Sequence, residues 1–185
     1  ANGFKADNND APIKVTVENS TDCPRYAGVT ISGVTVAPSP EWMVNKLTAI
    51  GVRSINNIVD ITNYILHETG QPLHAFDLKA VTGNEIIVKN VATGIKFTTL
   101  DDKERSLHAE DLMICNANES MCIAGVFGGS KSGVNNETTA IFLESACFHS
   151  TTIRKTSMRH GLRTDAATRF EKGIDISNTA NVLKR

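Results

Sequence analysis

Glu144 is the one charged residue in a run of apolar and small residues that extends from Ala140 to Phe148. The run contains no Gly or Pro and is rich in residues that favour strands, so it predicts a largely buried strand. Side chains alternate between the two faces of a strand, which places Glu144 on the same face as Phe142 and Phe148. A buried carboxylate needs a partner, because an unpaired buried charge is costly. That partner is either another group of the protein or a ligand, and the residues around Glu144 leave both open.

A glycine-rich segment, residues 125–133, precedes this strand and includes the adjacent Gly128 and Gly129. Glycine lets a backbone approach a ligand closely and exposes N–H donors. The spacing matches neither a Walker loop nor a dinucleotide-binding fingerprint. The segment is therefore either a flexible surface loop or one wall of a pocket whose other wall includes Glu144.

Arg53 and His74 are two further polar side chains with a possible role in such a pocket. Arg53 follows an expected helix end, where a cation is favoured with or without a function. His74 lies in residues 71–77, which we expect to form a loop because Pro72 cannot continue the preceding helix. There it has a plain structural alternative, a hydrogen bond to a backbone carbonyl or to Asp77.

Positive charge gathers in residues 154–169, which contain Arg159, His160 and Arg163. Such a cluster on a nearly neutral protein suits phosphate contacts, although a solvated helix face has the same composition. Thr164 and the residues after it turn into a new helix, whose first N–H groups can face an anion or a polar ligand. With no nucleophile elbow, metal-ligand cluster or catalytic carboxylate pair in the sequence, these residues indicate a polar pocket beside a basic surface and name no reaction.

The bulk properties describe an ordinary globular domain. The 185 residues are 41% hydrophobic and 21% charged, and the formal net charge of −1 argues against a chain-wide grip on nucleic acid. No stretch approaches the roughly 20 apolar residues of a membrane helix. The four cysteines show no zinc-site or C-x-x-C spacing, so we expect them to be reduced and structural, as in a cytosolic protein.

The elements that must position these side chains follow from periodicity and from Gly and Pro positions. We predict an α+β fold in which packed β-sheets form a sandwich-like core with flanking helices, residues 1–12 being a disordered lead-in. Ser150 and Asp165 are expected to cap the third and fourth helices. The expected strands are 13–17, 26–36, 85–90, 96–100, 112–115, 121–124 and 140–148, and the expected helices are 40–50, 58–69, 150–160, 165–172 and a last one beginning within 176–185.

Five segments occur in an order and spacing that resemble one known family: residues 53–64, 70–77, 125–133, 143–145 and 159–166. Together they resemble the central editing module of the bacterial phenylalanyl-tRNA synthetase beta subunit. The resemblance implies that residues 13–185 are a single editing domain excised from a larger subunit, which hydrolyses tyrosine wrongly attached to phenylalanine tRNA. It also implies the tRNA and the synthetase alpha subunit as partners, a cytoplasmic location, and no metal or cofactor in this domain, with ATP and magnesium used elsewhere in the whole enzyme.

The resemblance also assigns roles to individual residues. It implies that Glu144 recognises the phenolic hydroxyl of tyrosine, because a second site that hydrogen-bonds this hydroxyl discriminates where an apolar phenylalanine pocket cannot. The other residues of the implied pocket are Arg53 and His74, Gly128 or Gly129 as a wall, and Thr164 and Ala166 beside the aminoacyl end.

Water is expected to attack the ester, since no activated nucleophile is visible in the sequence. His74 would position or deprotonate this water, N–H groups of the glycine-rich segment would hold the carbonyl oxygen, and a ribose hydroxyl of the tRNA is an alternative helper. RNA contacts are expected at Arg159, His160 and Arg163. The competing hypothesis is a non-catalytic tRNA-binding or scaffold module.

Overall fold

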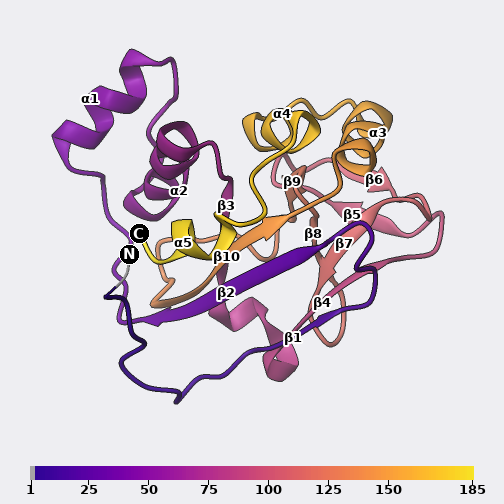
Figure 1. Cartoon of the computed structure of the whole chain (residues 1–185), viewed down its shortest axis with the longest axis horizontal. Helices are drawn as coiled ribbons and strands as arrows, with labels where there is room; N and C mark the ends of the chain where they lie inside the picture. Colours follow the sequence, from indigo (N-terminus) through magenta and orange to yellow (C-terminus); the bar gives the residue numbers. More distant parts are fainter. Residues whose placement is uncertain (1–2) are drawn as a thin grey trace.

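The computed structural model describes residues 3–185, which form three β-sheets and five α-helices (Figure 1). Residues 3–13 are without a helix or strand, and residues 1 and 2 lie outside the described part. The elements, in chain order, are β1 (Lys14–Val17), β2 (Arg25–Ser32), α1 (Glu41–Ala49), α2 (Asn57–Thr69), β3 (Leu73–Asp77), the 3-10 turns η1 (Leu78–Ala80) and η2 (Thr82–Asn84), β4 (Glu85–Asn90), β5 (Lys96–Thr98), β6 (Glu104–Ser106), β7 (Leu112–Cys115), β8 (Ser120–Ile123), β9 (Phe127–Gly128), β10 (Ala140–Cys147), α3 (Ser150–His160), α4 (Asp165–Lys172) and α5 (Thr179–Leu183).

Two of the sheets form the body of the protein. The larger has the strand order β1-β4-β7-β8-β9, and the smaller has the order β2-β10-β3, with β10 in the middle and antiparallel to both neighbours. The third sheet is the β5–β6 hairpin, whose turn contains Asp102 in the left-handed conformation (φ 58°). In Figure 1, α1 and α2 lie at one side of the molecule, and α3 and α4 lie together at another.

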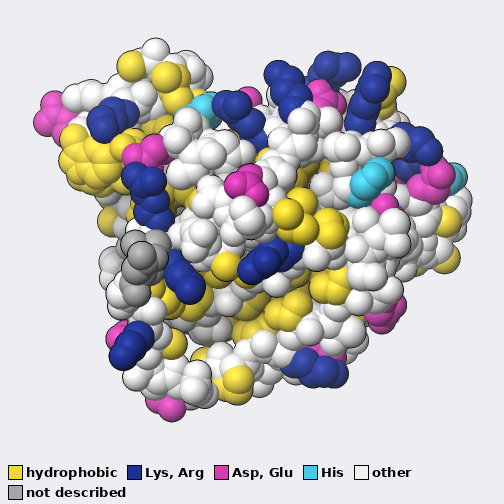
Figure 2. All heavy atoms as spheres, viewed as in Figure 1, with side chains coloured by type: hydrophobic (Ala, Val, Ile, Leu, Met, Phe, Trp, Pro, Cys, Tyr) yellow, Lys and Arg dark blue, Asp and Glu magenta, His cyan; other side chains and the backbone are white. Residues whose placement is uncertain are grey.

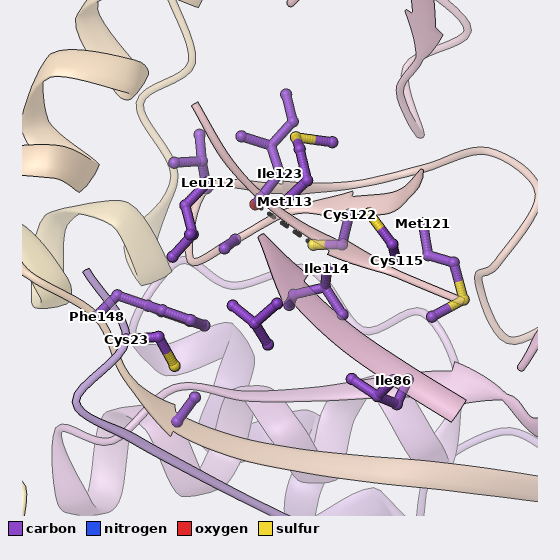
Figure 3. Packing of buried hydrophobic residues seen from close by; sticks show 14 of the residues in the cluster. Cys23, Ile86, Leu112, Met113, Ile114, Cys115, Met121, Cys122, Ile123 and Phe148 are labelled. Carbon is purple, nitrogen blue, oxygen red and sulfur yellow. Dashed lines mark hydrogen bonds between the residues drawn. The ribbon is translucent and has the colours of Figure 1, made fainter. Parts of the chain in front are cut away.

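The main core lies between the larger sheet and the smaller sheet (Figure 3). It combines Ile86 and Ile114 of the larger sheet with Phe76, Phe142 and Ala146 of the smaller one, and all five are buried. The core residues of β10 are thus the side chains that alternation places on one face with Glu144. The predicted α+β fold with packed sheets is confirmed.

The opposite face of the smaller sheet packs on helices and on a second, smaller core. Ile58 of α2 meets Ala75 of β3 and Ile141 of β10 there. The hydroxyl of Ser145 donates to the carbonyl of Thr179 in α5 at 2.9 Å. β10 is therefore covered on both faces, which explains why its sequence is almost entirely apolar or small.

Five local predictions need correction. The second strand ends at Ser32 and not at residue 36, because Gly33 turns the chain at a φ of 73°. Residues 73–77 form strand β3 and not a loop: Pro72 ends the helix, as predicted, but the chain pairs with β10 directly afterwards. The strand predicted for 96–100 ends at Thr98. The N-caps of α3 and α4 are His149 and Thr164, one residue before the predicted ones.

All four cysteines are free and buried, as predicted. None of the described helices has the length and apolar character to cross a membrane. Figure 2 shows many Lys and Arg side chains gathered over the region where α3 and α4 lie in Figure 1, so the basic segment does form a charged surface.

Gly28 on β2 provides a test of this packing. A Cβ atom added to Gly28 would lie 2.1 Å from Cζ of Phe142, whose ring covers this position. We expect Gly28→Ala to lower the free energy of unfolding by about 1–3 kcal/mol, because the ring must move within a close-packed core. Urea unfolding measures the loss. A Gly28→Ala/Phe142→Leu double variant should lose less than the sum of the two single variants, and strictly additive losses would contradict this explanation.

Candidate functional site

Glu144 stands in the middle of a row of three residues that crosses the smaller sheet. It pairs with Gly28 of β2 on one side and with His74 of β3 on the other. Residues directly opposite each other on antiparallel strands point to the same face, so Glu144 and His74 both face the space between the sheets. The two predicted side chains, 70 positions apart by their numbers, are thus brought together by strand register.

Glu144 has a protein partner in this structure. The hydroxyl of Tyr26 on β2 donates to Oε2 of Glu144 at 2.8 Å, and the Glu144 side chain is 5% exposed. Burial raises the pKa of Glu144 to about 8, although the hydrogen bond from Tyr26 opposes this rise. The pKa of Tyr26 lies well above its usual range because of burial and of the neighbouring Glu144, so its hydroxyl remains a donor at neutral pH.

His74 presents a buried nitrogen without a partner. Part of the residue is exposed, but Nε2 is buried and makes no hydrogen bond to the described residues. Its ring packs edge-on against Phe76, with centroids 4.4 Å apart. Burial lowers the pKa of His74 to about 4, so the imidazole is neutral at pH 7. A neutral imidazole with a free ring nitrogen can accept a hydrogen bond from water or from a ligand.

The raised pKa of Glu144 predicts how stability depends on pH. Folded Glu144 holds its proton up to about pH 8, whereas an unfolded Glu releases it near pH ~4.3. The protonated Glu144 stabilises the folded protein fully at pH values below the pKa of Glu144 in the unfolded chain. This stabilisation is lost as pH rises through the pKa of Glu144 in the folded protein. Between pH 6.5 and 8 we expect the wild type to lose about 1–2 kcal/mol of unfolding free energy that Glu144→Gln retains. This window lies above the range in which His74 titrates.

Urea unfolding at several pH values between 6 and 9 measures this difference. Glu137→Gln is the matched control, because Glu137 is exposed. It should follow the wild type at every pH. Parallel curves for the wild type and Glu144→Gln would contradict the assignment of the raised pKa to Glu144.

Of the two adjacent glycines, Gly128 is the one that lies against His74. A Cβ atom on Gly128 would lie 3.2 Å from Cε1 of His74 and 2.9 Å from Leu100, so only glycine fits easily. A Cβ atom on Gly129 would instead meet the carbonyl oxygen of Met121 at 2.6 Å. The segment that contains both glycines includes the short strand β9, and both glycines are buried, whereas Ser130 and Lys131 are exposed. The segment is therefore not a surface loop over its whole length.

The glycine-rich segment does line a hollow, but Glu144 is not among the residues of its walls. This hollow has a volume of about 340 Å³, and its walls include Lys79, Lys96, Gly129 and Lys131. A second hollow of about 220 Å³ lies between Gly70 and the end of α4. Neither of these two hollows is lined by Glu144 or His74. Neither hollow is therefore the predicted pocket, which would be bounded by both the glycine-rich segment and Glu144.

Several groups expected to face a ligand are already hydrogen-bonded within the protein. The N–H of Gly129 donates to Met121 at 2.8 Å and that of Ser130 donates to Thr98 at 3.1 Å, so neither is free to hold a carbonyl oxygen. The Thr164 hydroxyl donates to the carbonyl of Val126 and accepts from the N–H of Ala167.

Thr164 and Ala166 nevertheless stay close to the core that carries the site. The Thr164 bond to Val126 ties the start of α4 to the residue before β9. Ala166 is partly buried and packs against the main core cluster. Arg53 is exposed between α1 and α2, and no described hydrogen bond or ion pair links it to Glu144 or His74.

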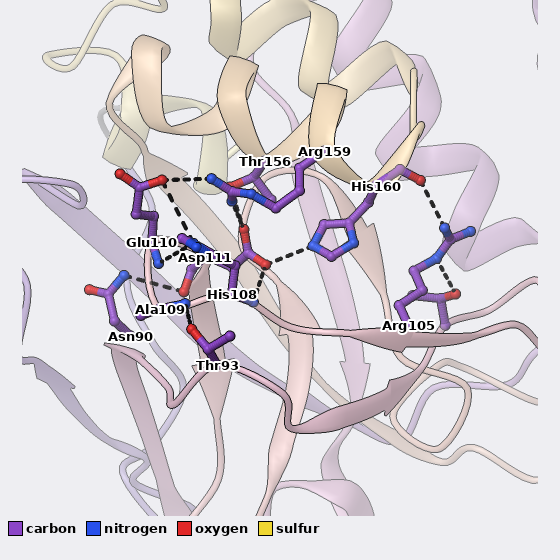
Figure 4. Close-up of polar contacts among 11 residues, drawn as sticks. Asn90, Thr93, Arg105, His108, Ala109, Glu110, Asp111, Thr156, Arg159 and His160 are labelled. Carbon is purple, nitrogen blue, oxygen red and sulfur yellow. Dashed lines mark hydrogen bonds and ion pairs between the residues drawn. The ribbon is translucent and has the colours of Figure 1, made fainter.

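Arg159 and His160 bind a buried carboxylate, Asp111, in the loop before β7 (Figure 4). His160 Nε2 lies 2.7 Å from Oδ2 of Asp111, Arg159 contacts Oδ1, and Arg159 also pairs with Glu110 at 2.7 Å. Arg159 thus already has two carboxylate partners within the protein, and His160 contacts one of them. Arg163 is exposed, and no ion pair to it is found among the described residues.

The sequence reasoning missed Tyr26 and Asp111. The alternation of side chains along a strand places Tyr26 and Gly28 on the same face, and the sequence alone could have predicted this. The pairing of β2 with β10, which brings the Tyr26 hydroxyl to Glu144, depends on contacts far apart in the chain and has no local signal. Among residues 3–185, no group of three or more His, Cys, Asp and Glu side chains is placed to hold a metal ion.

The sequence matches a known class of domain. Residues 22–185 match the family model described as "B3/4 domain", and the chain belongs to this family.

The chain is also similar to curated proteins of one kind. Over 182 residues the chain is 60% identical to the phenylalanine–tRNA ligase beta subunit of Bacteroides thetaiotaomicron, and over 177 residues it is 46% identical to that of Carboxydothermus hydrogenoformans. These matches cover 98% and 96% of this chain but 22% of each relative, so the chain spans about a fifth of the proteins it matches.

A solved structure shares the fold. It is an N-terminal fragment of the phenylalanyl-tRNA synthetase beta subunit from Pyrococcus horikoshii, with a TM-score of 0.51 and 13% sequence identity. The match covers 80% of this chain and 50% of that one. At this identity the likeness concerns the fold alone.

Proposed function

We propose that this chain is the editing domain of a phenylalanyl-tRNA synthetase beta subunit, and that it hydrolyses the ester bond of tyrosine attached to phenylalanine tRNA. Family membership and the 60% identical relative support the assignment to the synthetase. The observation that carries the editing step is the row formed by Glu144 and His74, which joins a hydroxyl acceptor to a neutral imidazole with an unpaired nitrogen.

The two side chains have separate roles in this proposal. Glu144 selects the substrate, because a buried carboxyl group can hydrogen-bond the phenolic hydroxyl that distinguishes tyrosine from phenylalanine. His74 positions the attacking water through Nε2. With a pKa of about 4 it is a weak base, which favours positioning over proton abstraction. A ribose hydroxyl of the tRNA supplies further activation. The reaction needs no metal or cofactor from this domain.

The direct test uses phenylalanine tRNA that carries labelled tyrosine. The 185-residue chain is added, and the released tyrosine is measured. We expect tyrosine to be released faster than phenylalanine is released from phenylalanyl-tRNA. The His74→Ala variant should still bind the mischarged tRNA but should no longer release tyrosine. Because His74 contacts Phe76 and lies against Gly128, thermal unfolding must first show that the variant is folded. Equal slow release with and without the protein would refute the proposal.

A non-catalytic scaffold role is the competing function, and one observation favours it. The Tyr26 hydroxyl already occupies one oxygen of Glu144, and neither hollow described above opens onto it. A scaffold role predicts that Glu144 variants change stability and leave tRNA deacylation unchanged. The variants of Glu144 therefore decide between the two functions.

The exposed basic surface is proposed to contact the tRNA backbone, with Arg163, which has no ion pair among the described residues, as one of the contacts. Removing one phosphate contact should weaken binding for all sequences and reduce the slope of log affinity against log salt by about 1. We expect weaker tRNA binding and this smaller slope for Arg163→Ala in a binding assay between about 50 and 200 mM salt. Lys14→Ala is the control, because Lys14 pairs with Glu85 on β4 at 2.9 Å. An unchanged salt slope in Arg163→Ala would exclude this contact.

A further inference from the structure

The two oxygens of the Glu144 carboxyl group have different surroundings. Oε2 accepts the hydrogen bond from Tyr26. No donor among the described residues hydrogen-bonds to Oε1, so this oxygen is without a protein partner there. Glu144 as a whole is 5% exposed.

Tyr26 is held in place by the sheet and by the core. Its backbone pairs with Ala146 of β10, two residues beyond Glu144, and its ring packs against the main core cluster. An aromatic side chain has only two rotatable bonds, so a packed ring fixes the position of its hydroxyl. The donor on Oε2 is thus a rigid part of the fold.

We propose that Tyr26 is a positioning residue for substrate selection, which occupies Oε2 of Glu144 and so leaves Oε1 alone to meet the phenolic hydroxyl of the substrate. This inference rests on the proposed editing function. One phenol built into the protein and one phenol from the substrate would then share a single carboxyl group. Tyr26 touches neither the ester nor the attacking water.

The arrangement works in both protonation states of Glu144. An ionised Oε1 accepts a hydrogen bond from the substrate hydroxyl, whereas a protonated carboxyl group that accepts from Tyr26 at Oε2 carries its proton on Oε1 and donates it to the substrate oxygen. Discrimination against phenylalanine follows in either case, because phenylalanine has no hydroxyl and would leave Oε1 without a partner.

The titratable groups around Glu144 come from four directions. They are Tyr26 on β2, His74 on β3, Cys122 on β8 and Cys23 before β2. Burial raises the pKa of both cysteines, and Cys23 reaches about 12, so neither thiol ionises near neutral pH. Only the Tyr26 hydrogen bond lowers the pKa of Glu144. Its removal should therefore move the Glu144 titration upward.

The test compares Tyr26→Phe with Tyr64→Phe in the 185-residue chain. Tyr64 is the other tyrosine of the sequence, and its hydroxyl contacts Lys46 at 3.2 Å, away from the site. The ratio of kcat/KM for tyrosyl-tRNA to that for phenylalanyl-tRNA should fall about tenfold in Tyr26→Phe and remain at the wild-type value in Tyr64→Phe. Carboxyl-carbon NMR of labelled Glu residues should show an upward shift of the Glu144 titration in Tyr26→Phe alone.

The outcomes separate the inference from the function on which it rests. If the wild type is selective and Tyr26→Phe is equally selective or more so, Tyr26 does not position Glu144, and an increase would identify it as a competitor of the substrate. If the wild type releases no tyrosine, the proposed function fails and the inference fails with it. A lower selectivity without a shift of the Glu144 titration would overturn the inference as well, because a general packing defect explains that result.

Discussion

Glu144→Ala should hydrolyse tyrosyl-tRNA and phenylalanyl-tRNA at similar rates. A hydrogen bond contributes about 0.5–1.5 kcal/mol when the carboxyl group is protonated and about 1.5–3 kcal/mol when it is ionised, so kcat/KM for tyrosyl-tRNA should fall about 3- to 100-fold. The value for phenylalanyl-tRNA should change much less, because phenylalanine offers no hydroxyl to Glu144. Deacylation of both substrates under single-turnover conditions measures the ratio.

Glu144→Ala removes a buried side chain and leaves the Tyr26 hydroxyl without its acceptor, so thermal unfolding must first show that the variant is folded. Glu144→Gln serves as the matched variant, since it retains both size and hydrogen-bonding capacity and should keep part of the selectivity. If Glu144→Ala retains the wild-type ratio, Glu144 does not read the hydroxyl and the scaffold function becomes the better explanation.

The strand around Glu144 was predictable because its signal is local. A short apolar run rich in strand-forming residues favours a strand, and alternation then places Glu144 with Phe142. The ends of α2, α3 and α4 were also local, since Gly70, Gly161 and Gly173 each stop a helix.

The neighbours of Glu144 were not predictable in this way. His74 was assigned to a loop because Pro72 dominates the local pattern, whereas pairing with β10 gives residues 73–77 their extended form. The same pairing sets the register that aligns His74 with Glu144, and the pairing of β2 brings Tyr26 to Oε2. Register of this kind follows from the packing of the whole sheet and not from the residues of one strand.

The basic segment shows that charged residues in a short stretch of sequence do not reveal their partners within the fold. Positive residues on α3 predict a surface for an anionic partner, and Figure 2 does show such a surface. Two of them, Arg159 and His160, also meet an internal anion, Asp111, which lies far back along the chain. A count of charges in a short segment cannot detect such a partner, so Arg159 and His160 remain only predicted RNA contacts, whereas their contacts with Asp111 are observed.

Asp111 anchors α3 to the larger sheet through these contacts. Its side chain is fully buried (0% exposed) and accepts hydrogen bonds from Thr156 at 3.0 Å, from His160 at 2.7 Å and from the N–H of His108 at 2.9 Å, besides the ion pair with Arg159. Burial alone would raise the pKa of Asp111, but these hydrogen bonds, led by that of His160, hold it below its usual range.

Asp111→Ala should therefore be among the most destabilising single changes in this chain. It leaves the buried Thr156 and His160 without their partner, and removing one member of a buried charged network costs about 3–5 kcal/mol. Urea unfolding followed by circular dichroism measures the change. Glu110→Ala is the matched control: Glu110 contacts the same Arg159, but its side chain is 56% exposed, so its loss should cost less than about 1 kcal/mol.

The dependence on pH gives this prediction a second, independent check. A carboxyl group whose folded pKa lies below its unfolded pKa stabilises the protein above the unfolded pKa, near pH ~3.9 for Asp, and this contribution is lost as pH falls through the folded value. The difference in unfolding free energy between the wild type and Asp111→Asn should thus be constant above about pH 5 and should shrink below about pH 4. A difference that stays constant down to pH ~2 would show that the charge of Asp111 does not anchor α3 and that its hydrogen bonds act without it.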